Sequence, residues 1–266
     1  MPDLAEISAL ADRIRLRALR MVEPLQFGYL GQALSAAELY ASVYGGPLRP
    51  AHDDVVVSPG HYIVCAYAAA AELGMLDAAG LDTYGQDDSE FEAIGTDRSQ
   101  GVSLSCGSLG QGLTGAAGFA LSNRLRGKTD ARTFAFLSDG EMEEGQVWEA
   151  AMFAAHWRLT NLVAVLDAND SQVDGPVSSI TTVEPLPEKW RAFGWDVYEV
   201  DGHNVGAIAT ALDQAIASDR PAIVIGRTST RHGLDAILPD DADGHFIKLP
   251  PAMALAAHEE LEARLA

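Results

Sequence analysis

Two polar loops of the sequence carry residues that could bind a metal ion. Asp139 closely follows one short apolar run, and Asn169 closely follows another apolar run 30 residues later. An intervening helix could bring this carboxylate and this amide oxygen to the ends of neighbouring strands. Mg²⁺ prefers such oxygen ligands and usually completes its coordination with substrate phosphates. With the backbone carbonyl of Ser171 as a third ligand, the pattern predicts a magnesium site with room for a diphosphate.

Each loop also has a simpler interpretation as a turn, because Asp, Asn and Gly are common turn residues. Either loop alone favours the turn, whereas the two together at strand ends favour the metal site. The acidic run that begins at Asp139 does not fit an EF-hand, since its glycine occupies loop position seven instead of six and position twelve is Ala150. The two-loop magnesium site is therefore the preferred interpretation.

A third loop, residues 105–112, contains three glycines and leads into a predicted helix. Glycine lets the backbone approach a ligand closely, although it also allows close helix packing. The loop lacks both the Gly-Lys-Ser/Thr of a Walker motif and the dinucleotide fingerprint G-x-G-x-x-G. By itself it indicates no particular ligand.

The fold that must position these loops is predicted to be α/β, with one domain over residues 1–266. Short β-branched runs alternate with helical patterns, and strands without polar alternation indicate a sheet buried on both faces. The predicted strands cover residues 55–57, 134–137, 162–166, 197–200 and 222–226. The predicted helices between them cover residues 62–73, 113–125, 146–155 and 205–217. We expect a mostly parallel sheet with helices on both faces.

In such a sheet, ligands bind outside the carboxyl ends of the strands. Polar loops follow four of the predicted strands, and they begin at residues 138, 167, 201 and 227. We therefore expect the functional site at this edge. Trp148 and Trp157, by contrast, are predicted to be core residues.

Both ends of the chain are predicted to be helical. Residues 5–22 show helical apolar spacing and form a helical N-terminal lead-in. Ser35 followed by Glu38 predicts a capping box that opens a second helix through Val43. A loop over residues 239–250 precedes a short helix over residues 251–266.

Charge and cysteine content exclude several classes of function. The sequence has 18 Lys and Arg against 38 Asp and Glu, a net charge of −20. Such a chain repels nucleic acid and anionic membranes, and we find no targeting or membrane-spanning segment. Cys65 and Cys106 give neither a disulfide framework nor a Cys-based zinc site. We expect a cytoplasmic protein with no nucleic-acid or membrane partner.

The segment that holds the two loops resembles the thiamine diphosphate and Mg²⁺ motif of transketolases, in which Gly-Asp-Gly is followed at a distance by Asn. It reads SDGEMEEGQVWEAAMFAAHWRLTNLVAVLDANDSQVDG over residues 138–175. Three further segments resemble the same family: SPGHYIVCAY at 58–67, CGSLGQGL at 106–113 and DGHN at 201–204. The likeness covers roughly residues 8–250 and implies the thiamine diphosphate-binding fold.

The resemblance implies roles for the residues of the two loops. Asp139, Asn169 and the Ser171 carbonyl would hold Mg²⁺. Gly140 and Glu141, together with Asn169, would contact the cofactor. The implied cofactors are therefore thiamine diphosphate and Mg²⁺.

Residues elsewhere would surround the reacting part of the cofactor. The resemblance implies that Gly107, Leu109 and Gly110 line the thiazolium ring or its neighbourhood. His61 would contact the diphosphate or the donor, and His245 would match a cofactor-site histidine, so both are implied catalytic residues. Without the family, local packing explains His61 equally well, and a loop position explains His245 almost as well.

Three positions depart from the family pattern. Tyr29 stands where most transketolases have the histidine of an N-terminal Gly-His-Pro-Gly, and Thr96 stands where a second Gly-His-Pro is usual. Ser138 replaces the first glycine of Gly-Asp-Gly, which is a milder change. Because sugar-handling groups are altered, an ordinary pentose phosphate substrate pair is not implied.

The resemblance also implies a partner chain. A whole transketolase continues into a pyrimidine-binding domain whose glutamate activates the cofactor, and no residue here resembles that glutamate. We expect a split enzyme in which a C-terminal transketolase-like subunit carries the pyrimidine-binding domain and an α₂β₂ heterotetramer forms. Small residues in the helices at 66–74 and 113–121 would permit close packing at a large interface.

The expected activity is transfer of a two-carbon ketol unit from a ketose-type donor to an acceptor. One alternative on the same cofactor is acyl transfer to a carrier protein, or a role as a 2-oxo acid dehydrogenase-type component. Another is a non-catalytic subunit that keeps the fold without turnover. The donor, the acceptor and the pathway are not determined by the sequence.

Overall fold

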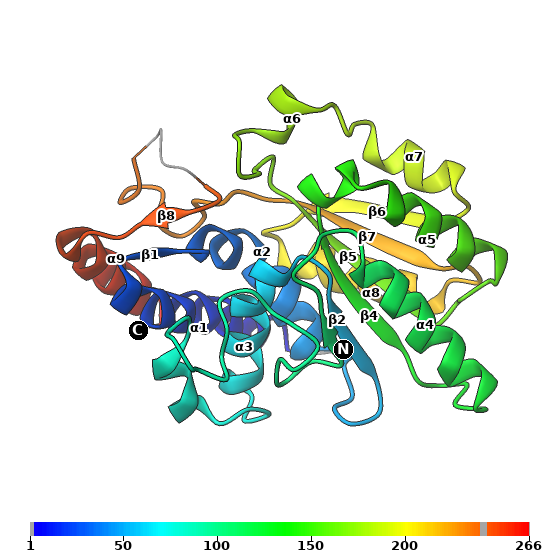
Figure 1. The fold of residues 1–266 in the computed structure, drawn as a ribbon, viewed down its shortest axis with the longest axis horizontal. Helices are drawn as coiled ribbons and strands as arrows, with labels where there is room; N and C mark the ends of the chain where they lie inside the picture. The colour runs from blue at the N-terminus through cyan, green and yellow to red at the C-terminus, as the bar shows by residue number, and fades with distance from the viewer. Residues whose placement is uncertain (1–2, 240–243, 266) are drawn as a thin grey trace.

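The computed structural model describes residues 3–239 and 244–265, and a six-stranded sheet forms its centre (Figure 1). All neighbouring strands of this sheet run parallel. In spatial order the strands are β3 (Leu104–Ser105), β2 (Asp54–Val57), β4 (Thr133–Ser138), β5 (Leu162–Ala168), β7 (Ala222–Arg227) and β6 (Asp196–Asp201). The central strands β4 and β5 are buried along their whole length. The predicted parallel α/β fold is confirmed.

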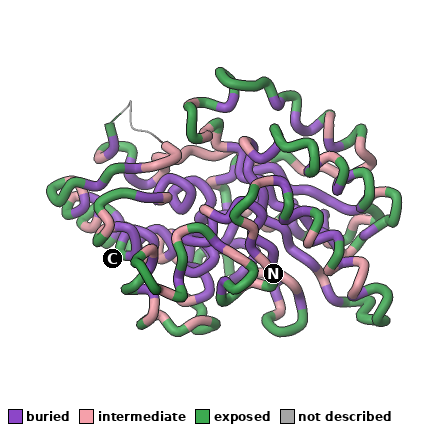
Figure 2. The backbone as a smooth tube through the Cα atoms, viewed as in Figure 1, coloured by how far each residue is buried: buried purple, intermediate pink, exposed green. Residues whose placement is uncertain are grey.

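Helices cover both faces of the sheet (Figure 1). One core includes residues of α1 (Leu4–Val22), α2 (Leu30–Tyr44), α3 (Ile63–Glu72), α8 (Val205–Ala217) and α9 (Pro251–Ala263). The other core includes residues of α4 (Gly112–Leu125), α5 (Gly145–His156) and α7 (Leu186–Ala192). Successive residues of β4 alternate between the two cores, so Phe136 enters the first and Leu137 the second. Figure 2 shows the resulting buried layer through the sheet.

Several short elements were not predicted. β1 (Phe27–Gly28) pairs antiparallel with β8 (Ile247–Lys248), and α6 (Val177–Ile180) follows the second polar loop. The 3-10 turns are Glu23–Leu25, Gly60–Tyr62, Ala78–Thr83 and Gly140–Glu143. Part of the predicted 239–250 loop, residues 240–243, lies outside the described residues. The β1–β8 pair brings residues near position 27 against residues near position 247.

The predicted start of the second helix is wrong. α2 begins at Leu30 after its N-cap residue Tyr29, so Ser35 and Glu38 lie inside the helix. The Ser35 hydroxyl donates to Asp167 Oδ2 at 2.5 Å instead of capping a helix. Every residue of α2 is buried, so tertiary packing and not a local cap determines where this helix starts.

The prediction for one of the two tryptophans is also wrong. Trp157 caps the end of α5 and is 46% exposed. Trp148 does pack inward, with its ring centroid 5.4 Å from that of Trp190 and 5.1 Å from that of Phe193.

Most of the helix expected at 66–74 is buried within this chain and is not open to a partner. α3 is buried from Ile63 to Ala70 within this chain, because its alanines pack against α1 and α2. α4 differs, since Thr114 and Gly118 are exposed on its outer face.

Neither cysteine is paired, and no helix within residues 3–239 and 244–265 has the length and apolar character needed to cross a bilayer. Cys65 is buried and Cys106 is half-buried. Burial raises the pKa of both thiols, so neither is an activated nucleophile.

A buried ion pair joins the first two helices. The side chain of Arg15 is fully buried, and its guanidinium donates to Glu38 Oε2 at 2.5 Å and to the Leu34 carbonyl at 3.0 Å. The backbone N–H of Ser229 donates to His203 Nε2, so His203 Nδ1 carries the proton and donates to Glu38 Oε2 at 3.1 Å. This cluster ties α1 and α2 to the loops that follow β6 and β7.

We expect Arg15→Met to lower the free energy of unfolding by about 3–5 kcal/mol, because it leaves the Glu38 carboxylate buried without its cation. Arg20→Met is the matched control on the same helix, since Arg20 pairs with the exposed Glu262 at 3.2 Å, and it should cost less than about 1 kcal/mol. Urea unfolding of both variants measures the difference. Equal costs would show that the buried pair contributes no more than the surface pair.

The same cluster predicts a loss of stability in acid. Burial acts to raise the pKa of Glu38, but the His203 hydrogen bond and the Arg15 charge lower it to about 2 from its ordinary value of 4.5. Because the folded-state pKa is the lower one, Glu38 contributes stability above pH 4.5 that is lost as the pH falls toward 2.

Candidate functional site

The two predicted metal-binding loops meet at the carboxyl ends of β4 and β5. These strands are neighbours in register, with Ser138 opposite Asp167. The side chain of Asp139 is buried, and its Oδ2 accepts a hydrogen bond from the backbone N–H of Asp170 at 2.6 Å. The Asp139 carboxylate therefore lies against the peptide that follows Asn169. The structure thus brings together the two residues that the sequence placed on separate loops.

The other predicted oxygen ligand lies in the same place. Asn169 Oδ1 accepts a hydrogen bond from the backbone N–H of Ser171 at 2.9 Å. A Cβ added to Gly140 would lie 3.9 Å from the Ser171 carbonyl oxygen and 3.2 Å from Gln172 Cβ. A side chain at position 140 would lie against Gln172 and the Ser171 carbonyl, so glycine leaves this part of the backbone uncovered. The Asp139 carboxylate accepts from the Gly140 N–H, and the Asn169 amide oxygen accepts from the Ser171 N–H. This donor set fits Mg²⁺.

The electrostatics of this edge favour a bound cation. Burial, together with the neighbouring Asp167 carboxylate, raises the pKa of Asp139 to about 7. Desolvation and like charge both oppose a bare carboxylate, so a positive ion at this position would relieve both. A cavity of about 440 Å³ adjoins Asp139 and Asn169 and extends to Arg227 at the end of β7.

Glu141 connects the acidic loop to the glycine loop. It is fully buried, and its Oε1 accepts hydrogen bonds from the Gly110 backbone N–H at 2.7 Å and from the Ser58 hydroxyl. Its second oxygen, Oε2, is buried with no hydrogen-bond partner among the described residues. Burial raises the pKa of Glu141 to about 7. Through the hydrogen bond from Gly110, Glu141 therefore fixes the position of the glycine loop, residues 105–112.

The glycines of that loop serve close packing. Gly110 has φ +81°, and a Cβ there would lie 2.8 Å from Glu144 Cβ. A Cβ on Gly112 would lie 2.4 Å from Ser58 Cα. Gly107 is exposed and Leu109 is partly exposed, so these two remain predicted cofactor neighbours.

The two predicted histidines lie together, although 184 residues separate them in the sequence (61 and 245). Their ring centroids are 4.8 Å apart, and the Tyr29 ring lies 5.2 Å from His61 and 5.8 Å from His245. The Gln32 side-chain amide donates to the His245 carbonyl at 3.1 Å. Burial and the proximity of His245 lower the pKa of His61 to about 3, so its imidazole is neutral at physiological pH.

This aromatic group is continuous with the oxygen ligands. A Cβ added to Gly244, the residue before His245, would lie 3.2 Å from Ser171 Oγ. Asp243, which completes the predicted Asp-Gly-His match, lies outside the described residues. The region from Asp139 through Ser171 to His61 therefore forms one site.

Comparison with known proteins agrees with this geometry. Residues 7–245 match the family model described as the thiamine diphosphate binding domain of transketolase. The chain belongs to the transketolase family.

Two curated relatives match this chain and are of similar length to it. The chain is 36% identical over 262 residues to the 6-deoxy-6-sulfo-D-fructose transketolase subunit SqwG of Clostridium sp. (strain MSTE9), covering 95% of this chain and 94% of the relative. It is also 36% identical over 254 residues to the putative uncharacterized transketolase family protein y4mO of Sinorhizobium fredii, covering 91% of this chain and 90% of the relative.

Longer transketolases match over part of their length. Human transketolase is 31% identical over 275 residues, but the chain spans only 44% of it. The transketolase structure from Campylobacter jejuni superposes with a TM-score of 0.81 at 22% identity, covering 97% of this chain and 47% of that one. This likeness shows the shared fold.

The two departures from the transketolase histidine pattern lie on segments that pack near residues 60 and 61. Tyr29 contacts the His61 ring as described above. Thr96 follows Gly95, whose backbone N–H donates to the Gly60 carbonyl at 2.8 Å. Tyr29 therefore contacts His61 directly, and the segment of Thr96 is hydrogen-bonded to the residue before His61.

Gly31 allows the backbone of the His245 segment to pack closely against α2. A Cβ on Gly31 would lie 1.9 Å from the Gly244 carbonyl oxygen. We expect Gly31→Ala to displace the 244–246 segment, to destabilise the protein by about 1–3 kcal/mol and to weaken cofactor binding. Gly206→Ala on α8 is the control, because no atom lies closer than 3.5 Å to a Cβ there. Thermal unfolding and cofactor titration of both variants test this, and a Gly31→Ala variant that behaves like the control would contradict it.

Sequence reasoning missed four polar residues beneath the site. Ser35, Tyr62, Asp167 and Thr228 form a hydrogen-bonded group around Asn169. Only Asp167 left a signal, because an acidic residue ends an otherwise apolar run there. The others come from distant segments with no motif to mark them.

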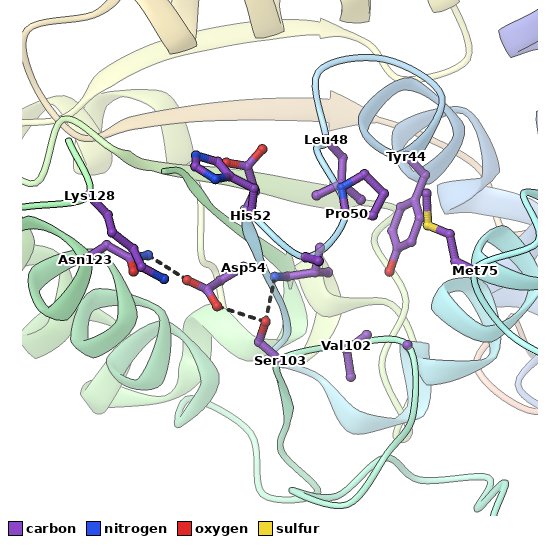
Figure 3. Close-up of a pocket in the computed structure, with 14 residues that line it drawn as sticks. Tyr44, Leu48, Pro50, His52, Asp54, Met75, Val102, Ser103, Asn123 and Lys128 are labelled. Carbon is purple, nitrogen blue, oxygen red and sulfur yellow. Dashed lines mark hydrogen bonds between the residues drawn. The ribbon is translucent and has the colours of Figure 1, made fainter. Parts of the chain in front are cut away.

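A separate pocket of about 380 Å³ lies at the amino ends of the strands, beside the start of β2 (Figure 3). The Asp54 carboxylate in it accepts hydrogen bonds from Asn123 Nδ2 at 2.7 Å and from Ser103 Oγ at 3.1 Å. Because Asp139 and Asn169 lie at the carboxyl ends of the strands, this pocket is not part of the transketolase site.

Proposed function

We propose that this chain is the diphosphate- and Mg²⁺-binding subunit of a two-component transketolase-like enzyme. The complex would transfer a two-carbon ketol unit from a ketose-type donor to an acceptor. The observation that carries this proposal is the contact between the Asp139 carboxylate and the Asn169–Asp170 peptide, next to the open space at Gly140. Family membership supports thiamine diphosphate as the cofactor.

Under this proposal each site residue has a binding or positioning role. Asp139, Asn169 and the Ser171 carbonyl hold Mg²⁺, and the open backbone at Gly140 receives the diphosphate. Glu141 holds the glycine loop with Gly107, Leu109 and Gly110 beside the thiazolium ring. Thiamine diphosphate supplies the carbon nucleophile needed to break and form bonds beside a carbonyl group.

The histidines act on the substrate side of the proposed site. His61 is neutral because burial lowers its pKa to about 3, so it can donate one hydrogen bond without carrying a charge. His61 and His245 would donate to the diphosphate or to the donor carbonyl oxygen, where negative charge develops.

We further propose that a second chain completes the enzyme. The relative SqwG is named a transketolase subunit and aligns over nearly its whole length. The partner would be a C-terminal subunit that carries the pyrimidine-binding domain. Residues 1–266 would form one domain, and the complex would have α₂β₂ stoichiometry. The outer face of α4 and α5 suits this partner, since Phe153 borders an apolar groove of about 370 Å³, and Met152 and Trp157 are exposed nearby. The unpaired cysteines fit a reducing cytoplasm.

One rival reaction has specific support. Tyr29, which contacts the His61 ring, and Thr96 replace two family histidines, so the donor could instead be a 2-oxo acid, with acyl transfer to a carrier protein or a dehydrogenase-type role. The test is a donor panel on the complex, which compares ketose phosphates and 6-deoxy-6-sulfo-D-fructose with 2-oxo acids. We expect two-carbon transfer only from the ketoses. Turnover of 2-oxo acids alone would establish the rival reaction, and cofactor binding without turnover of any donor would indicate a non-catalytic subunit.

A further inference from the structure

One buried carboxylate lies directly beneath the proposed metal site. Asp167 stands near the end of β5 and is 2% exposed. Its Oδ2 accepts hydrogen bonds from Ser35 Oγ at 2.5 Å, from Tyr62 OH at 2.8 Å and from Asn169 Nδ2 at 2.8 Å. Its Oδ1 accepts from the Thr228 hydroxyl. Four donors from four separate segments therefore converge on one carboxylate.

The same hydroxyl groups also contact the Asn169 amide. Asn169 Nδ2 lies 2.9 Å from Tyr62 OH and 3.2 Å from Ser35 Oγ. Since both hydroxyls donate their proton to Asp167, their lone pairs are free to accept from the amide. All three oxygens around Nδ2 are therefore acceptors toward it.

This arrangement determines which way the amide faces. A reversed Asn169 would place its carbonyl oxygen against the Asp167 carboxylate, where two acceptors would meet without a proton in a buried position. Nδ2 must consequently point inward, and Oδ1 must point toward the Ser171 backbone, whose N–H donates to it at 2.9 Å. An amide oxygen directed outward is what a metal ligand at this position requires.

We infer that Asp167 is a positioning residue, which locks the Asn169 amide with its oxygen toward the Mg²⁺ position. The inference rests on the proposed function, because Asn169 must be a ligand for its orientation to matter. Ser35 and Tyr62 support the lock, and Thr228 holds the opposite carboxylate oxygen without contacting Asn169 through a hydrogen bond.

The test is a mutant cycle on the full chain, reconstituted with its second subunit and saturated with thiamine diphosphate. Mg²⁺ affinity is measured by calorimetry for Asp167→Asn, Asn169→Ala and the double variant, with thermal unfolding as a second readout. We expect Asp167→Asn to lower Mg²⁺ affinity by about 10–100-fold, as loss of a group that orients a ligand does. In the Asn169→Ala background the same change should cost clearly less, because there is no amide left to orient and only the loss of the Asp167 charge beside Asp139 remains.

Thr228→Val is the matched control. It removes one hydrogen bond from the same carboxylate on the oxygen that does not face Asn169, so it should lower the unfolding temperature while Mg²⁺ affinity changes by less than about twofold. If Asp167→Asn fails to fold, Tyr62→Phe takes its place, since the Tyr62 hydroxyl bonds to both Asp167 and Asn169. That variant should weaken Mg²⁺ binding several-fold, again only when Asn169 is present.

The outcomes distinguish a failure of the proposed metal site from a failure of the positioning role of Asp167. Unchanged Mg²⁺ affinity in Asn169→Ala would overturn the proposed metal site itself. A clear loss in Asn169→Ala, combined with no loss in Asp167→Asn or with losses that multiply in the double variant, would leave the metal site standing and overturn the positioning role of Asp167.

Discussion

Asp139→Ala is expected to abolish Mg²⁺-dependent binding of thiamine diphosphate, with an affinity loss of more than about 100-fold. Loss of a group that only orients a metal ligand already costs about 10–100-fold, and Asp139 is the sole carboxylate among the three proposed ligands. Its burial and the nearby Asp167 charge disfavour the bare carboxylate, and a bound cation would offset both. Calorimetric titration of the reconstituted complex, with and without Mg²⁺, measures the loss.

Asp170→Asn is the control for this experiment. It removes a neighbouring carboxylate whose oxygens accept hydrogen bonds from the backbone N–H and hydroxyl of Ser178, and it leaves the Asp170 backbone N–H on Asp139 in place. The Asp170 variant should bind the cofactor within about threefold of the parent chain. Equal affinities for the Asp139 and Asp170 variants would remove Asp139 from the metal site.

The second large effect concerns the partner. We expect the isolated chain to show no ketol transfer, and addition of the C-terminal subunit to raise the rate by at least about 10³-fold, because the group that activates the cofactor would come from that subunit. Initial rates with each subunit alone and with the mixture measure this directly. Turnover by the isolated chain at the rate of the mixture would contradict the two-component account.

A surface variant shows where the partner binds. Phe153→Asp introduces a charge on the exposed face of α5, where Phe153 is 41% exposed beside the apolar groove. We expect it to prevent both complex formation and turnover. Leu255→Asp makes the same kind of change on α9, at a residue that is 62% exposed and belongs to the other face of the sheet, and it should leave the complex intact. Loss of the complex in both variants, or in neither, would place the partner elsewhere.

Strands β4, β5 and β7 were predictable because they are continuous apolar runs that end in polar loops, whereas the short edge strand β3 was not predicted. Burial on both faces demands that pattern, and β4 and β5 show it along their whole length. Their adjacency places Asp139 next to Asn169, so the sequence was sufficient to bring this pair together. Ser171 follows from its position two residues further along the same loop.

Other features depend on packing that no local pattern records. Ser35 has the sequence of a helix cap but lies inside a fully buried helix, where its hydroxyl reaches Asp167. Trp157 ends a helix and stays exposed because the core of that face is filled by residues such as Trp190 and Trp195. The contact of Tyr29 with His245 joins positions far apart in the sequence. Only the family resemblance named His245, and nothing indicated that Tyr29 would touch it.

The most direct test of the whole account is a crystal structure of the two-subunit complex with thiamine diphosphate and Mn²⁺ in place of Mg²⁺. Anomalous scattering from Mn²⁺ locates the ion independently of the surrounding density. We predict one ion held by the Asp139 carboxylate, the Asn169 amide oxygen and the Ser171 carbonyl, with the diphosphate next to it. An ion bound to other residues, or a diphosphate held away from the Gly140 backbone, would contradict it.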